Sequence, residues 1–220
     1  MNRIKLLELH LEIGSVIIGE RFKGGTFRPC QTTIPSSTIE GALRHYFGVE
    51  VPAVGYFAKD EKNKGNTYEF DEFTYSVRDK FLNVSRMPIT TVYLRPRGKN
   101  GKIEAKVYIP YDKGVSLKDE LIGAEFQIGA LKSKGFGKSK IIGVNEIESE
   151  IKQGILKVKV FEGEAGEFGI EPISPVYGYL FKPDKFSIGG IYKRALFPGS
   201  LVKAPEVLLK EVTYYDEWDG

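Results

Sequence analysis

Cysteine and histidine, on which many catalytic and metal sites are built, are nearly missing from this chain. Its 220 residues include one cysteine, Cys30, and two histidines, His10 and His45. A single cysteine excludes an internal disulfide framework and a cysteine-based zinc site, and two histidines leave little for a histidine metal centre. We therefore expect no metal site and no cofactor.

Long apolar segments are missing as well. No apolar run approaches the roughly 18 residues that a helix needs to cross a bilayer. The first residues lead straight into an alternating pattern, without the apolar stretch and small-residue cleavage site of a signal peptide. We expect a cytoplasmic protein that does not contact membranes.

The chain also has no strong excess of charge. The 32 lysines and arginines exceed the 29 acidic residues by three, and the pI of about 8.7 is below the value of about 9 typical of dedicated nucleic-acid domains. With 41% hydrophobic and 28% charged residues, the composition is that of a globular protein. The many lysines and glutamates and only two methionines suggest a thermophilic source.

Periodic patterns predict an α+β fold with an antiparallel sheet. Apolar and polar residues alternate over residues 3–13, which predicts a half-buried strand. Residues 37–47 carry an apolar helical face, with Ser36 or Ser37 as the N-cap and Gly48 as the stop. Strands are expected later in the chain, at 68–77, 89–95, 102–109, 124–128, 139–144 and 155–160.

Two details of this pattern concern the later strands. Asn100 followed by Gly101 predicts a hairpin between residues 89–95 and 102–109. After about residue 148 the pattern restarts, and the 155–160 strand is expected to place Lys157 and Lys159 outside. We therefore expect two domains, at 1–148 and 149–220, with a hairpin insertion around 89–109 in the first.

The segment 128–138 (IGALKSKGFGK) is a candidate phosphate-binding loop. Glycines at 129, 135 and 137 permit positive φ, and successive amides in such a loop can cradle phosphate oxygens. Lys132, Lys134 and Lys138 surround those amides, and Phe136 is placed to stack on a base. The spacing is wrong for a P-loop, and no helix follows as in a dinucleotide fold. An ordinary solvated loop explains these residues equally well.

Two other segments are candidates for contact with nucleic acid. Ser37 opens the predicted helix, where hydroxyls and free amides favour a phosphate, and Arg44 lies two turns further in. Arg21, Lys23 and Arg28 alternate with phenylalanines in a glycine-rich loop, a composition that suits single-stranded nucleic acid. A well-capped helix and a flexible surface loop are the alternatives.

Histidine 45 is the one candidate for catalysis. A histidine can act as the acid or base when RNA is cleaved through its 2′-hydroxyl without a metal. Tyr46 lies beside His45 in sequence, but neighbouring helical residues point about 100° apart, so the two side chains are not expected to face each other. His10 is expected on the polar face of the first strand, at the surface or against a partner subunit.

Residues 35–44 (PSSTIEGALR) resemble the P-x-S-[ST]-h-x-G-A-h-R helix motif of the RAMP superfamily of CRISPR-associated proteins. Residues 128–137 match the glycine-rich signature h-G-x5-G-x-G of the same superfamily. Each motif is weak alone, but together, in this order and after an alternating strand, they are fairly specific. The two motifs cover about 25 residues directly, and their spacing implies that the resemblance extends over about the first 145 residues.

This resemblance implies a ferredoxin-like, RRM-type domain with a hairpin insertion, followed by a reduced second domain that is β-rich or ferredoxin-like. It also implies a role in antiviral defence, with single-stranded CRISPR RNA and other effector subunits as partners. The early position of the glycine-rich loop resembles the subunits that cap the 5′ tag of the guide RNA, in which the hairpin would be a thumb. The family's repeat-processing endonucleases usually carry this loop near the carboxy terminus.

We therefore expect a non-catalytic RNA-binding subunit of a ribonucleoprotein complex. The expected RNA contacts are Arg21, Lys23, Arg28, Ser37, Arg44, Gly129, Lys132, Lys134, Gly135, Phe136, Gly137 and Lys138. Two alternatives stay open. One is a metal-independent endoribonuclease that uses His45, and the other is an interaction module with no RNA affinity of its own.

Overall fold

The alternating segment at the start of the chain forms the central strand of the molecule, β1 (Arg3–Ile13). A computed structural model describes residues 2–19, 26–59, 65–76, 78, 81, 84, 87–98, 101–183 and 189–210. β1 pairs antiparallel with β7 (Ile103–Pro110) along one edge and with β9 (Lys138–Ile155) along the other. Leu6 on one face of β1 and Leu7, Leu9 and Leu11 on the other are all buried, so the strand has a core on both sides.

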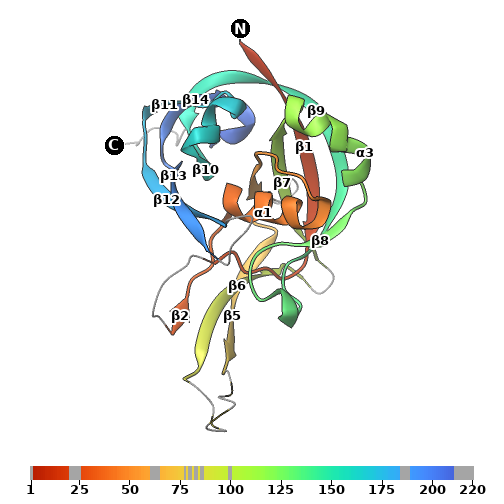
Figure 1. The fold of residues 1–220 in the computed structure, drawn as a ribbon, viewed down its shortest axis with the longest axis vertical. Coiled ribbons are helices and arrows are strands. Elements are labelled where there is room, and N and C mark those ends of the chain that lie inside the picture. The colour runs from red at the N-terminus through yellow and green to blue at the C-terminus, as the bar shows by residue number, and fades with distance from the viewer. Residues whose placement is uncertain are drawn as a thin grey trace, which may run out of the picture.

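The largest sheet curls around this strand (Figure 1). Its order within the described residues is β11-β14-β9-β1-β7-β4-β3, and β8 also pairs with β9. All pairings in this sheet are antiparallel, and helices are few, so the molecule is a strand-rich α+β protein, as predicted. The strands not yet given bounds are β3 (Thr33–Ile34), β4 (Val54–Phe57), β8 (Glu125–Gln127), β11 (Glu171–Ser174) and β14 (Leu201–Pro205).

Helix α1 (Ser36–Phe47) covers one face of the sheet, close to its predicted bounds. Ile39 and Leu43 are fully buried against Leu7, Leu9 and the other inward residues of β1. Gly48 ends the helix in the left-handed conformation, as predicted, and its amide donates to the Arg44 carbonyl.

The predicted serine N-cap of α1 is wrong. Pro35 occupies the N-cap position, and no side chain caps the helix there. The Ser36 hydroxyl instead donates to the Lys159 carbonyl, 3.2 Å away. The start of the helix is therefore fastened to the C-terminal part of the chain, a contact between residues 123 positions apart.

The C-terminal part of the chain packs on the opposite face of the sheet. Leu6, Val54 and Tyr108 point to that side and form a second core with buried residues between 156 and 209. Strand β9 passes through the expected boundary at residue 148 without a break, pairing first with β1 and then with β14. The remaining elements here are β10 (Val160–Phe161), η3 (Glu162–Phe168), β12 (Tyr177–Pro183), β13 (Gly190–Leu196) and η4 (Glu206–Leu208).

A hairpin projects from the body, but it is not the predicted one (Figure 1). It consists of β5 (Tyr68–Tyr75) and β6 (Ile89–Pro96), and β2 (Phe27–Arg28) adds to β6 in parallel. The expected partner of β6 was residues 102–109, but in the described structure these residues belong to β7, between β1 and β4. The reason is that β7 buries both Val107 and Tyr108, on opposite faces, which a projecting hairpin cannot provide.

Short helices link β7 to β8. They are α2 (Tyr111–Gly114), η1 (Val115–Leu117) and α3 (Lys118–Leu121). The strand expected at 155–160 is not continuous, because β9 ends at Ile155 and β10 begins at Val160. Lys159, expected outside, is only 9% exposed. Among the described residues, no helix is long and apolar enough to cross a bilayer.

Candidate nucleic-acid interface

The glycine-rich segment 128–138 is an ordered turn between β8 and β9. Its middle is a single 3-10 turn, η2 (Lys132–Lys134), flanked by Leu131 and Gly135 in the left-handed region. Gly129 and Gly137 also have positive φ, of 78° each. Four residues with positive φ so close together fix one path of the backbone, which a flexible surface loop does not have.

Two of the glycines allow the loop to pack against neighbouring backbone. A Cβ on Gly137 would lie 1.9 Å from the Ile128 carbonyl oxygen, and one on Gly129 would lie 2.2 Å from that of Ile17. A Cβ on Gly135 would meet nothing within 4 Å. Glycine is thus required at 129 and 137 for close packing and at 135 only for its backbone angle.

Four of the loop amides serve the fold, which limits the expected phosphate cradle. The amide of Ala130 donates to the Ile17 carbonyl at 2.9 Å, and that of Gly137 donates to the Ser15 carbonyl at 2.7 Å. The amides of Lys134 and Gly135 close the 3-10 turn on the carbonyls of Leu131 and Lys132. These four donors are engaged within the protein, so cations are left as the main candidates for phosphate contact.

The lysines of the loop are held at the surface by this rigid backbone. Lys134 and Lys138 are exposed, whereas Lys132 is half-buried with its Nζ 5.8 Å from the centre of the Tyr46 ring. Burial lowers the pKa of Lys132, because the charged ammonium loses contact with water. Lys140, one step further, is paired with Glu125 at 3.2 Å.

Phe136, expected to stack on a base, instead anchors the loop to the projecting hairpin. Its ring is 9% exposed and lies 5.5 Å from the Phe73 ring and 5.1 Å from the Tyr93 ring, edge to face in both cases. The ring is therefore covered by β5 and β6. The structure gives Phe136 a role in fixing the loop and hairpin together.

The other expected RNA contacts are dispersed around α1. Arg28 is exposed on β2, and Ser37 is half-buried at the start of α1. Arg44 bonds to Glu50 at 3.4 Å and to the Pro183 carbonyl at 3.5 Å, so it joins α1 to the end of β12. Arg21 and Lys23 lie outside the described residues.

The two histidines occupy different environments. His45 is exposed, and the expectation that it faces away from Tyr46 is wrong, because their rings meet edge to face with centroids 4.9 Å apart. His10 lies on the polar side of β1, as expected, where its Nε2 is 2.5 Å from Glu8 Oε1. In the described parts of the chain, no three His, Cys, Asp or Glu side chains are grouped to hold a metal ion.

Glu8 is the centre of a polar network that the sequence analysis missed. It is 8% exposed and accepts a hydrogen bond from the Tyr108 hydroxyl at 2.7 Å, while Lys106 lies 3.7 Å away. Burial alone would raise the pKa of Glu8, but the bonds from Tyr108 and His10 and the charge of Lys106 outweigh it, so the pKa is lowered. No sequence signal pointed to it, because Glu8 falls on the polar positions of the alternating β1 pattern, next to His10 and Glu12.

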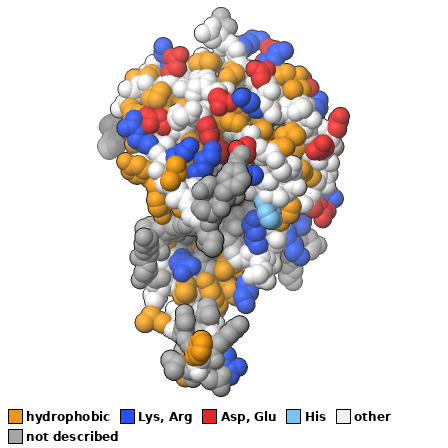
Figure 2. Space-filling model, viewed as in Figure 1, with side chains coloured by type: hydrophobic (Ala, Val, Ile, Leu, Met, Phe, Trp, Pro, Cys, Tyr) orange, Lys and Arg blue, Asp and Glu red, His pale blue; other side chains and the backbone are white. Residues whose placement is uncertain are grey.

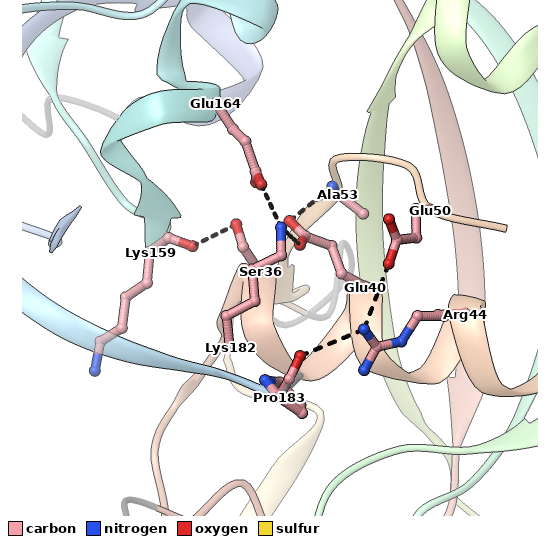
Figure 3. A network of polar contacts seen from close by, with 9 residues as sticks. All are labelled: Ser36, Glu40, Arg44, Glu50, Ala53, Lys159, Glu164, Lys182 and Pro183. Atoms are coloured by element: carbon pink, nitrogen blue, oxygen red, sulfur yellow. Dashed lines mark hydrogen bonds and ion pairs between the residues drawn. The ribbon is translucent and has the colours of Figure 1, made fainter. Parts of the chain in front are cut away.

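A second network joins α1 to the C-terminal part (Figure 3). Lys182 Nζ lies 2.8 Å from Glu164 Oε1 and 3.5 Å from Glu40 Oε2. Burial, and the hydrogen bond and charge of Glu164, raise the pKa of Glu40 to about 9. Local sequence gives no sign of this cluster, because its members are brought together only by the packing of three elements.

Comparisons with known proteins relate this fold to solved complexes. One similar chain comes from a cryo-EM structure of the Type III-B Cmr-beta bound to cognate target RNA, with TM-score 0.57, 10% identity and coverage of 90% of this chain and 86% of the other. A chain from the Cmr-beta complex bound to cognate target RNA and AMPPnP, state 1, gives TM-score 0.54, with the same identity and coverage. No protein-family model and no curated protein matches the sequence. At 10% identity, the likeness describes the fold.

Proposed function

We propose that this chain is a CRISPR-associated subunit of the RAMP type that binds single-stranded guide RNA without cleaving it, inside a ribonucleoprotein effector complex. Two independent lines support the proposal. The helix motif at 35–44 and the glycine-rich motif at 128–137 resemble that superfamily, and the fold is similar to chains in complexes that contain RNA.

The order of strands supports the ferredoxin-like part of this proposal. The strands β9-β1-β7-β4 are adjacent and antiparallel, α1 connects β1 to β4, and the short helices connect β7 to β9. This is the order of elements of a βαββαβ unit, with β9 as its last strand. We retain residues 1–148 as this unit and 149–220 as the reduced second part.

The observation that carries the proposal is the rigid lysine loop. Lys134 and Lys138 are exposed, and Lys132 is half-buried beside them, on a backbone fixed by its contacts to residues 15–17. Cations held in place bind a phosphate chain with less loss of side-chain and loop entropy than cations on a mobile loop. Phe136 ties the loop to the hairpin, so an RNA strand on these lysines would also pass the middle of β5 and β6.

The other residues that were expected to contact RNA have different roles in the proposed complex. Arg28 is exposed on β2, which pairs with the half of β6 that lies toward the hairpin tip, where it would add a phosphate contact. Arg44 is held by Glu50 and the Pro183 carbonyl, so its part would be to position β12 next to α1. Gly129 and Gly137 would act through the shape of the loop.

The experiment replaces Lys132, Lys134 and Lys138 together with alanine and measures RNA binding at several salt concentrations. Each phosphate contact releases counterions, so we expect weaker binding and a log–log salt slope that is flatter by roughly one unit per lost contact. The matched control replaces Lys5, Lys152 and Lys203, which are exposed and pair with glutamates. It changes the net charge equally, and we expect its affinity and slope to stay near those of the parent chain.

The outcomes separate the proposal from its rivals. Unchanged affinity and slope in the loop variant, or an equal loss in the control, would overturn it. Cleavage of CRISPR-repeat RNA in the presence of chelator, abolished by His45→Ala, would make the chain an endoribonuclease. A chain that co-purifies with partner subunits but has no RNA affinity of its own would be an interaction module.

A further inference from the structure

We propose that the pocket between the start of α1 and the β12–β13 hairpin receives one unstacked base of the RNA strand. This inference rests on the proposed function, because it assigns a second contact to the same bound strand. The pocket was not among the expected sites. Its signal in the sequence is the alternation of Tyr177, Tyr179 and Phe181, which places three aromatic side chains on one face of a strand.

The pocket has the size and lining of a small-molecule site. Its volume is about 410 Å³, within the range of roughly 300–1,000 Å³ that such sites occupy. One wall consists of aromatic rings from β12, β13 and the residue after β13, namely Tyr179, Phe181, Tyr192 and Phe197. The opposite wall is the start of α1, with Ser37 and Thr38.

The aromatic rings are open to a stacking partner. Tyr179 is 66% exposed and Tyr192 is 53% exposed, which is unusual for side chains of this size. Phe181 faces Tyr192 across the two strands, with ring centroids 5.5 Å apart and planes at 69°. Rings fixed in this way present faces to an incoming base, and base stacking does not depend on base identity.

The pocket wall also carries a positive charge. Lys159 is 9% exposed, donates to Gln31 Oε1 at 2.6 Å and lies 4.4 Å from the centre of the Phe197 ring. A buried cation next to aromatic rings suits a ligand that combines a flat ring with an anionic group. A nucleotide has both features.

Helix α1 connects this pocket to the lysine loop. Ser37 lines the pocket at the start of the helix, and Tyr46, nine residues later, lies against Lys132 of the loop. At 1.5 Å and 3.6 residues per turn, α1 rises about 14 Å and makes about two and a half turns between Ser37 and Tyr46. An RNA strand that joins the two sites therefore passes around α1 as well as along it, a path that a short run of nucleotides covers. Figure 2 shows Lys and Arg side chains on this face, some on the body and a few where the hairpin leaves it. A strand bound to the loop lysines therefore reaches the pocket, which favours RNA over an apolar protein side chain as the occupant.

The test uses the 220-residue chain, a labelled oligoadenylate and an abasic ribose-phosphate oligomer of the same length. Tyr179→Ala combined with Tyr192→Ala should weaken binding of the oligoadenylate on the order of tenfold or more, since stacking contributes about 1–3 kcal/mol per base. The salt slope should not change, because no phosphate contact is removed. Binding of the abasic oligomer should be the same in the variant and the parent.

Ile191→Ala is the matched control. Ile191 is 60% exposed and directly precedes Tyr192 in β13, so its side chain points to the opposite face of the strand from the Tyr192 ring. We expect it to bind like the parent. Unchanged oligoadenylate affinity in the tyrosine variant, while the loop-lysine variant still loses affinity, would overturn the pocket and leave the proposed function standing. If the parent binds neither oligomer, the proposed function fails and the pocket assignment fails with it.

Discussion

At the scale of single residues, the most unusual group is Glu40, an acid buried next to another acid. Only about 12% of its side chain is exposed, and 16% of that of Glu164. Glu164 Oε2 is buried without a hydrogen-bond partner among the described residues. A proton on Glu40 would supply the missing donor, and Lys182 would then balance the single remaining negative charge. We therefore interpret the cluster as one proton and one ion pair shared by three side chains.

This interpretation makes stability depend on pH in a defined direction. The pKa of Glu40 rises from an ordinary value of 4.5 to about 9 on folding, so the native state binds its proton more tightly than the unfolded chain does. The resulting stabilisation is complete below the ordinary pKa and is lost as the pH rises toward about 9. Glu40→Gln keeps a donor at this position at every pH. We expect its melting temperature, relative to that of the parent chain, to increase between about pH 6 and pH 9.

The control for Glu40→Gln should replace a glutamate that does not share a buried proton with another carboxylate. Glu50 is exposed, follows the end of α1 and pairs with Arg44 of that helix, so Glu50→Gln is the matched control. Its melting temperature should differ from that of the parent by a constant amount over the same range. A constant difference for Glu40→Gln as well would show that Glu40 is ionised in the folded protein at neutral pH.

At the scale of elements, the glycine-rich loop is a structural device as much as a candidate binding site. Gly137→Ala would force a Cβ into contact with the Ile128 carbonyl, and the atoms that it meets are backbone, which cannot move aside as a side chain can. Gly135→Ala introduces only the cost of a left-handed alanine, on the order of 1–2 kcal/mol. In urea unfolding we expect Gly137→Ala to lose clearly more stability than Gly135→Ala. Equal losses would mean that the close approach to Ile128 does not constrain the loop.

Elements with a local cause were predictable from sequence. The alternation of Leu7, Leu9 and Leu11 with polar residues gave β1 its bounds, and Gly48 gave the end of α1. The glycines at 129, 135 and 137 do adopt positive φ. In each case one short pattern determines the backbone without help from distant residues.

Features that depend on distant contacts were not predictable. The pairing of β6 with β5, and not with β7, follows from where β7 is buried. Phe136 and Lys159 were expected at the surface. In the structure the hairpin covers Phe136, and Lys159 contacts Gln31 and the Phe197 ring. Glu8 and Tyr108 are 100 residues apart in the chain. A single sequence gives the periodicity of each segment but not the segment that covers it.

At the scale of the whole molecule, β9 joins the two parts of the chain into one structure. Its first residues pair with β1 and its last with β14, so the sheet continues across residue 148. The second core contains Leu6 and Tyr108 from before this point together with Phe168 and Leu196 from after it. Neither residues 1–148 nor residues 149–220 therefore have a complete core alone. The proposed ferredoxin-like unit, residues 1–148, is in this sense a unit of topology and not of folding.

Truncation provides the test of this coupling. A chain of residues 1–148 would expose Leu6, Val54 and Tyr108, each at most 1% exposed in the whole protein, and would cut β9 within its paired region. At roughly 1.5–3 kcal/mol for each buried apolar side chain, losing this cover removes most of the 5–15 kcal/mol that typically stabilises a domain. We expect the fragment to aggregate or bind a hydrophobic dye, and the whole chain to unfold in one calorimetric transition. A fragment that unfolds cooperatively on its own, or a whole chain with two separate transitions, would show two independent folding units, because a shared core lost in one step cannot give two transitions.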